Sequence, residues 1–188
     1  MAVQELLLEN STSEQMGLSI GELMPYFCLP STDDKLYSNS TFKESPCVAI
    51  CFTSNHCPYA RGYEERLRNL SEKYQSSGLQ MVFIMSNDGS SYPEDNYEKM
   101  KEKDFPFPYL HDDAQTTAKA FGAEATPEVF IFDKTQKLRY HGGIDDSPKD
   151  ETQVKEAYAE NAIKAILTGS EVPKSEALFI GCSIKWKL

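Results

Sequence analysis

Two short apolar runs place the strongest constraint on the fold of this chain: CVAICFT at 47–53 and LQMVFIMS at 79–86. Neither run alternates apolar with polar residues, which is typical of strands buried on both faces of a sheet. Between them an amphipathic segment begins near Pro58 and stops at Gly78, because glycine is favoured just after a helix. Its inward stripe comprises Ala60, Tyr63, Leu67, Leu70 and Tyr74. A strand–helix–strand unit of this kind predicts two parallel strands.

Two further pairs of short strands are indicated on either side of this unit. EVFIFD (128–133) and KLRYHG (137–142) are separated by a short polar turn, which predicts an antiparallel hairpin. Near the N-terminus, MPYFCL (24–29) and LYS (36–38) flank the turn-forming residues PSTDDK, which predicts a smaller hairpin. The chain thus combines parallel with antiparallel strands, and we expect a mixed sheet.

Three more helices are expected after the second buried run. YEKMKEKD (97–104) and DAQTTAKAFG (113–122) indicate two short ones, and the second ends at a glycine. A last helix is expected to begin with Ser147 as its cap and Pro148 at its first position. Its buried face would comprise Val154, Ala157, Tyr158, Ala162, Ala165 and Ile166. The sequence therefore predicts an α/β fold, a central mixed β-sheet flanked by helices on both faces.

The length of 188 residues favours one domain with a sizeable core. We expect a single domain over 1–188. Within it, residues 1–20 would form a polar lead-in, and residues 170–188 a C-terminal tail with apolar content but no clear period.

Composition argues against several classes of partner. A net charge of −10 repels phosphate backbones, so no nucleic acid is expected. No apolar run reaches the roughly 18 residues of a membrane span, and the N-terminus lacks the charge and apolar core of a signal peptide. Five cysteines, an odd number, fit a reducing compartment, and we expect a cytoplasmic protein. No metal site is expected, since cysteine and histidine spacings do not match known ligand patterns.

Cys57 is the residue most suited to chemistry. Pro58 is favoured at the first position of a helix, which places Cys57 at or beside the N-cap. Free N–H groups and the positive end of the helix dipole stabilise a thiolate there, so its pKa should fall below roughly 8.5. Arg61, one turn on, and the adjacent His56 are candidates to add positive charge near the sulfur. The alternative is that Cys57 is a small capping residue.

The second thiol of a redox pair is harder to identify. The fourth position of a C-x-x-C motif is Ala60, and Cys51 would lie roughly 20 Å away along an extended strand. We expect Cys47 and Cys51 to be core thiols and Cys28 to be packing in its short strand. Cys182, in the tail, is either a resolving thiol or another packing residue.

Several other residues could have either a structural or a functional role. Pro127 could follow a cis peptide bond at Thr126, or enter the strand by an ordinary trans bond. Glu128, next to it, is a candidate for proton handling. We expect these others to have no catalytic role: Asp145 and Asp146 as solvated loop carboxylates, Trp186 as a packing anchor, and His111 and His141 as isolated side chains.

Five segments together resemble the peroxiredoxin-like branch of the thioredoxin superfamily, commonly labelled redoxin or AhpC/TSA-like. They are FTSNHCPYA, YPEDNYEKM, FPYLHDDAQTTAKAFGAEATPEVFIFD, GGIDDS and IGCSIKWK, and the resemblance covers roughly residues 20–188. It implies a thioredoxin-like fold with an N-terminal hairpin and a C-terminal extension.

The resemblance also assigns residues. Cys57 matches the first cysteine of the thioredoxin C-x-x-C, and Thr126-Pro127 matches the cis-proline pair that faces the reactive sulfur and binds extended substrate backbone. Cys182 matches a tail cysteine of this branch, and Ser54 stands where a peroxidatic site keeps a hydroxyl three residues before its cysteine. A peroxidatic site also has an arginine near the sulfur, for which Arg61 and Arg139 are the candidates.

We therefore expect a thiol-dependent, antioxidant-type oxidoreductase in which Cys57 is the single nucleophile. It would reduce a peroxide or exchange with disulfides, with no cofactor. Its partners would be a thiol reductant, thioredoxin or glutathione, and a peroxide or disulfide substrate, and the protein would be a monomer or homodimer. The alternative is a redox-inactive thioredoxin-fold module that binds peptides, or one that senses redox state without turnover.

Overall fold

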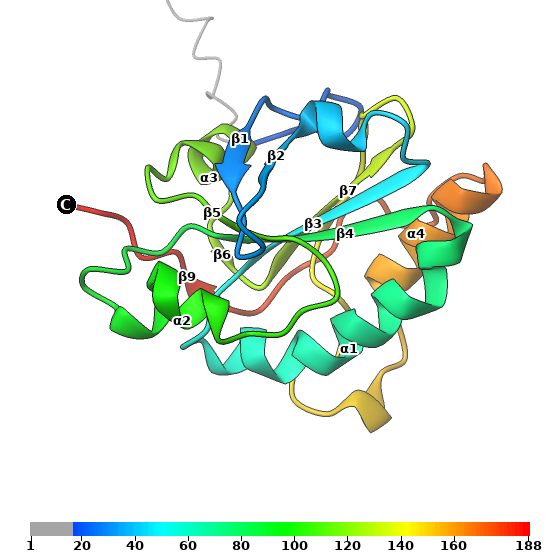
Figure 1. Ribbon diagram of the computed structural model, residues 1–188. Coiled ribbons are helices and arrows are strands. Elements are labelled where there is room, and N and C mark those ends of the chain that lie inside the picture. Colours follow the sequence, from blue (N-terminus) through cyan, green and yellow to red (C-terminus); the bar gives the residue numbers. More distant parts are fainter. Residues whose placement is uncertain (1–16) are drawn as a thin grey trace, which may run out of the picture.

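In the computed structural model, which describes residues 17–188, a five-stranded sheet forms the centre of the molecule (Figure 1). Its strands lie in the order β5-β4-β3-β7-β8. Their bounds are β3 Cys47–Thr53, β4 Leu79–Met85, β5 Tyr109–His111, β7 Glu128–Asp133 and β8 Leu138–Gly142. β3 pairs parallel with β4 and antiparallel with β7, and β8 pairs antiparallel with β7. The predicted crossover, hairpin and mixed sheet are confirmed.

Helices cover both faces of this sheet. Helix α1 (Pro58–Tyr74) and helix α4 (Tyr158–Thr168) pack on one face, with the short α2 (Tyr97–Lys101) beside them. On the other face lie α3 (Thr116–Phe121) and the hairpin of β1 (Cys28–Pro30) and β2 (Leu36–Ser38). The α/β class and the two covered faces are as predicted.

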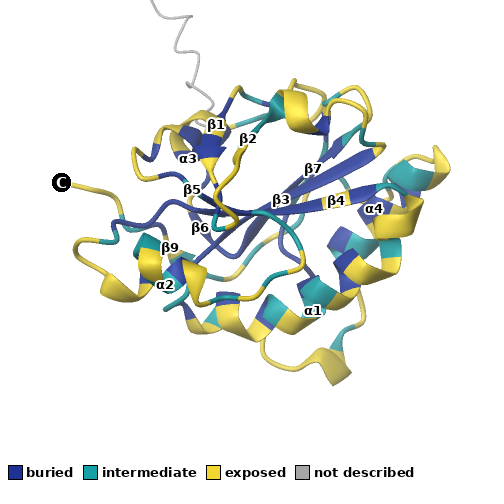
Figure 2. Cartoon of the chain, in the orientation of Figure 1, coloured by how far each residue is buried: buried dark blue, intermediate teal, exposed yellow. Residues whose placement is uncertain are grey.

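The strand β3 explains why the core divides into two layers. All seven of its residues are buried (Figure 2). Their side chains alternate between the two faces of the sheet. Ala49 and Cys51 pack toward α1 and α4, while Ile50 and Phe52 pack toward α3. The Phe52 ring meets Phe121 edge-on at a centroid distance of 5.4 Å. Burial of each such large side chain contributes about 1.5–3 kcal/mol.

The expected start of the last helix is wrong. Helix α4 begins at Tyr158, and the preceding residues form a loop with one short 3-10 turn, Glu151–Gln153. Asp145 is buried rather than solvated: it accepts from Arg66 Nη1 at 2.7 Å and from the Ser147 N–H at 2.9 Å. Because Ser147 N–H is used in this turn and its hydroxyl donates to the Asp150 carbonyl, Ser147 does not cap a helix.

The N-terminal hairpin is shorter than expected. β1 begins at Cys28, and within it only Leu29 is buried, so Cys28 is exposed and not a packing residue. Three further 3-10 turns connect the elements: Asn39–Phe42, Gln75–Ser77 and Pro93–Asp95. The lead-in predicted for residues 1–20 lies for the most part outside the described residues.

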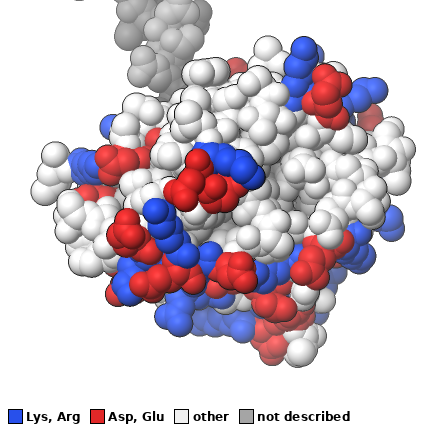
Figure 3. All heavy atoms as spheres, in the orientation of Figure 1, with Lys and Arg blue, Asp and Glu red and all other residues white. Residues whose placement is uncertain are grey.

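The C-terminal tail returns to the carboxyl end of β3. There β9 (Cys182–Ser183) pairs antiparallel with the two-residue strand β6 (Ala125–Thr126), which leads into β7. Acidic and basic side chains are mixed over the lower part of the face seen in Figure 3, along α1 and α2. None of the helices in residues 17–188 has both the length and the apolar character needed to cross a membrane.

Candidate active site at Cys57

Cys57 occupies the predicted junction between β3 and α1. It is the N-cap residue of α1, and its backbone is extended, with φ −69° and ψ 120°. Its side chain is fully buried and accepts a hydrogen bond from the Ala60 N–H at 3.5 Å. The thiol lies 3.1 Å from the Thr126 carbonyl oxygen, to which it can donate when protonated. The sulfur is therefore held between a helix N-terminus and the residue before Pro127.

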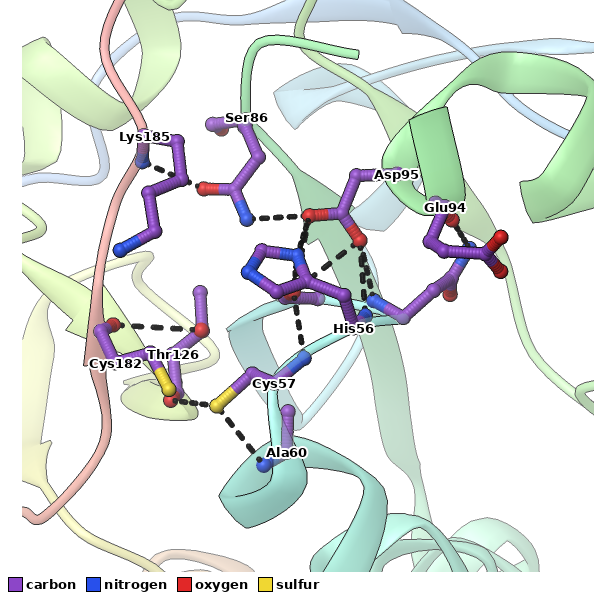
Figure 4. Close-up of polar contacts among 12 residues, drawn as sticks. His56, Cys57, Ala60, Ser86, Glu94, Asp95, Thr126, Cys182 and Lys185 are labelled. Carbon is purple, nitrogen blue, oxygen red and sulfur yellow. Dashed lines mark hydrogen bonds and ion pairs between the residues drawn. The ribbon is translucent and has the colours of Figure 1, made fainter. Parts of the chain in front are cut away.

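The loop before Cys57 is organised by a buried carboxylate, that of Asp95. It accepts the N–H groups of Asn55 at 2.7 Å and His56 at 3.1 Å, and the Ser54 hydroxyl at 3.0 Å (Figure 4). Ser54 in turn accepts the Cys57 N–H at 3.2 Å. Asp95 thus fixes the turn that presents Cys57 to the helix.

His56 has a different environment from the one expected. Its Nδ1 bonds to Asp95, and its ring stacks on Tyr92 with centroids 5.2 Å apart. Its partner is therefore the Asp95 carboxylate and not the Cys57 sulfur.

Cys182 is brought to the site by β9. Thr126 and Cys182 are cross-strand partners, and the neighbouring Ile184 N–H donates to the Glu124 carbonyl at 2.9 Å. In Figure 4 the sulfur atoms of Cys57 and Cys182 point toward one another. Cys182 is half-buried, and both cysteines are free thiols. Of the alternatives left open by the sequence, the structure places Cys182 beside the candidate nucleophile.

The two thiols differ in acidity. Burial raises the pKa of Cys57, but hydrogen bonds from Cys182, the Ala60 N–H and Thr126 outweigh it, and the pKa lies below its ordinary value. For Cys182, burial and then the contact with Cys57 raise the pKa to about 11. Cys57 is therefore the more acidic of the two thiols, and Cys182 keeps its proton to higher pH.

Neither candidate arginine is among the hydrogen-bond partners of the Cys57 sulfur in residues 17–188. Arg61 is exposed on α1, and no hydrogen bond or ion pair joins it to Cys57 within residues 17–188. Arg139 pairs with Asp133 at 3.1 Å, and Asp133 lies opposite Cys47 at the other end of β3. The expectation for Arg139 is wrong, while the role of Arg61 stays a prediction; the groups that lower the pKa of Cys57 are N–H, hydroxyl and thiol donors.

The segment after Thr126 is held by a second buried carboxylate. The Thr126–Pro127 peptide bond is cis. Glu128 is fully buried, accepts the N–H groups of Glu124 at 2.8 Å and Ala125 at 2.9 Å, and pairs with His141 Nε2 at 2.6 Å. His141 is therefore not isolated. Glu128 stabilises the start of β6 through backbone N–H groups there and does not contact Cys57.

The other cysteines are separate from this site. Cys47 and Cys51 are fully buried in the core, as expected, and burial raises the pKa of both, to about 12 for Cys47. No three histidine, cysteine or acidic side chains among residues 17–188 are grouped so as to hold a metal ion.

Sequence reasoning assigned no role to Asp95. It lies in the YPEDNYEKM segment, 39 residues after His56, and no local pattern shows which backbone N–H groups its carboxylate accepts. The only available signal was the resemblance carried by that segment as a whole.

The fold and the cysteine at a helix N-terminus define a thioredoxin-like protein. Residues 20–141 match the AhpC/TSA family, and the chain belongs to this family as a peroxiredoxin-like member. A peroxiredoxin Q, chloroplastic, from Oryza sativa subsp. japonica is 26% identical over 130 residues, which cover 65% of this chain and 58% of the relative. The match thus spans just over half the length of that relative.

Solved structures share the fold. An uncharacterized conserved protein from Geobacillus kaustophilus is 38% identical, covers 90% of this chain and 93% of its own, and superposes with a TM-score of 0.85. Peroxidoxin BcpB from Mycobacterium tuberculosis is 17% identical, with a TM-score of 0.57 over 81% of this chain and 97% of its own. At that identity the likeness concerns the fold alone.

Proposed function

We propose that the protein is a thiol peroxidase that uses Cys57 as its nucleophile and Cys182 as its resolving thiol. The observation that carries the proposal is the placement of Cys182 beside the buried Cys57, since Thr126 contacts the Cys57 sulfur and is the cross-strand partner of Cys182. The lowered pKa of Cys57 and the raised pKa of Cys182 support the two roles. A capping residue in a binding module has no need of a lowered pKa or of a neighbouring thiol.

In the first step the Cys57 thiolate attacks one oxygen of a hydroperoxide. The O–O bond breaks, Cys57 becomes a sulfenic acid, and the departing oxygen takes a proton from solvent and leaves as water or an alcohol. The N–H of Ala60 faces the sulfur and orients it throughout.

In the second step the Cys182 sulfur attacks the sulfenic sulfur of Cys57. The S–O bond breaks, a disulfide forms, and the oxygen leaves as water with the proton of Cys182. The charge of Cys57 contributes to the raised pKa of Cys182, and that charge disappears on oxidation. Cys182 therefore becomes easier to deprotonate when it is needed as a nucleophile.

An external thiol reductant closes the cycle. Thioredoxin or glutathione would reduce the Cys57–Cys182 disulfide by exchange and become oxidised itself. We also propose a cytoplasmic location, since free cysteines persist in a reducing compartment. The quaternary state that we propose is a monomer or a homodimer.

Turnover tests this function. The protein should consume hydrogen peroxide continuously when dithiothreitol is supplied, and Cys57→Ser should abolish consumption. Cys28→Ser is the matched control, since Cys28 is exposed and lies outside the site, and it should leave the rate unchanged. Stoichiometric oxidation of Cys57 without recycling would instead indicate a redox sensor. No difference between Cys57→Ser and the parent protein would overturn the proposal.

A further inference from the structure

The last part of the chain runs as a continuous strap, residues 175–187, across the site. It begins at β8, where the His141 N–H donates to the Ser175 carbonyl at 2.9 Å and the Ala177 N–H donates to the His141 carbonyl at 3.1 Å. It then passes Pro127 and contributes β9, whose Cys182 faces Thr126. The strap is thus tied to the body of the protein before it reaches Cys57.

At Gly181 the strap lies directly on the Thr126–Pro127 peptide. A Cβ atom at Gly181 would stand 2.3 Å from the Thr126 carbonyl oxygen and 3.2 Å from the Pro127 nitrogen. Real Cβ atoms do not approach other atoms so closely, so only glycine permits this contact. No room remains between strap and body for another polypeptide backbone.

Beyond β9 the strap is anchored a second time, by the side chain of Gln115. Its Nε2 donates to the Lys185 carbonyl at 2.8 Å, and its Oε1 accepts the Lys187 N–H at 2.8 Å. Gln115 is buried and has a φ of 59°. The Asp88 N–H also donates to the Lys185 carbonyl, at 2.8 Å.

The strap occupies the edge that an incoming peptide would need. Extended peptides commonly bind by adding a strand to a free sheet edge. Here the edge of β6 next to Cys57 is already paired with β9. The strap side chains Leu178 and Ile180 also lie beside Pro127, since all three line one pocket.

We propose that the strap restricts Cys57 to small hydroperoxides and excludes peptide and protein disulfides from it. The inference rests on the proposed function and names its substrate class. Access of larger reagents to Cys57 requires the strap to lift, and the two anchors at Gly181 and Gln115 each oppose this movement, so that loss of either one eases it. The half-buried Cys182 remains the sulfur that a reductant meets from solvent.

Size-dependent alkylation of the reduced full-length protein tests the strap. Iodoacetamide and a polyethylene-glycol maleimide would be applied separately, and modification of Cys57 followed by peptide mapping. Gln115→Asn tolerates the positive φ but is too short to hold Lys185 and Lys187, so modification of Cys57 by the large reagent should accelerate about tenfold. The rate of Cys57 modification by iodoacetamide should increase much less. Gly181→Ala, at the other anchor, should have the same effect.

Gln136→Asn is the matched control. Gln136 also has a φ of 59°, but its Nε2 donates to the Asn39 carbonyl, and Asn39 is not part of the strap. In Gln136→Asn both reagents should modify Cys57 at the rates seen in the parent protein. Equal acceleration of both reagents in Gln115→Asn, or no change in either strap variant, would overturn the inference. Failure of peroxide to oxidise Cys57 would instead reject the proposed function, and the alkylation result would still stand.

Discussion

Thr126 and Cys182, 56 residues apart in the chain, face each other as cross-strand partners of β6 and β9. The Thr126 carbonyl also lies 3.1 Å from the Cys57 sulfur, so one residue borders both thiols. The two thiols of a thioredoxin C-x-x-C lie in one short motif, whereas the two thiols here come from a helix N-terminus and the C-terminal strap.

The first prediction concerns the hydrogen bond from Cys182. Cys182→Ala removes the donor that does most to lower the pKa of Cys57, so that pKa should rise. Cys182→Ser cannot form a disulfide either but keeps a donor, so the pKa should rise less. The pH profile of Cys57 alkylation by iodoacetamide measures the pKa of Cys57 in each variant. Equal pKa values in the two variants would mean that the Cys182 donor does not stabilise the thiolate.

The second prediction concerns stability at alkaline pH. Because the pKa of Cys182 is raised to about 11 in the folded state, folding favours its protonated form. Its contribution to the free energy of unfolding is complete below the unfolded pKa of roughly 8.5 and is lost as the pH rises through about 11. Urea unfolding across this range should therefore be less pH-dependent in Cys182→Ser than in the parent protein.

The contribution of Cys57 to the free energy of unfolding depends on pH in the opposite direction. Its folded pKa is lowered, so its contribution is present above the unfolded pKa and is lost as the pH falls through the folded value. In Cys57→Ser this loss on the acid side should disappear. A parent and a variant with parallel pH profiles would contradict the assigned shifts.

The third prediction concerns Asp95. Asp95→Asn should lower the free energy of unfolding by about 1–3 kcal/mol, because an amide nitrogen would face backbone N–H groups in a buried site. It should also slow alkylation of Cys57, whose N–H depends on Ser54 and through it on Asp95. Asp150→Asn, in an exposed turn, is the control and should change neither quantity. Loss of stability without slower alkylation would limit Asp95 to a structural role.

A matching prediction applies to Glu128, which supports β6. Glu128→Gln should cost about 1–3 kcal/mol of stability, because the buried carboxylate accepts two backbone N–H groups and pairs with His141. Glu124→Gln changes an exposed side chain in the same turn and should be neutral. Thermal unfolding of the two variants compares them directly, and similar midpoints would contradict this role of Glu128.

The sequence predicted best what local patterns determine. The run 47–53 forms β3 and Pro58 begins α1, as predicted. Each element is determined by residues within its own segment, the apolar run in one case and the proline in the other. The predicted start of α4 was wrong because the loop before this helix is held by a contact that no local pattern encodes. The contact joins Asp145 to Arg66, which lies 79 residues earlier in the chain.

The same distinction applies to the site. The position of Cys57 at a helix N-terminus follows from its neighbours in sequence. Asp95 and the strap anchor Gln115 act on backbone groups brought together by the fold, so their roles could not be predicted. Arg61 was assigned to the sulfur from helical spacing; it is exposed on α1, and its role stays a prediction.

Oxidation of the reduced protein by one equivalent of hydrogen peroxide tests the central claim most directly. Samples quenched at successive times and analysed by peptide mapping should contain Cys57 sulfenic acid first and a Cys57–Cys182 disulfide afterwards. In Cys182→Ser the sulfenic acid should persist. Oxidation of exposed Cys28 as fast as that of Cys57, or a disulfide that omits Cys182, would contradict the account.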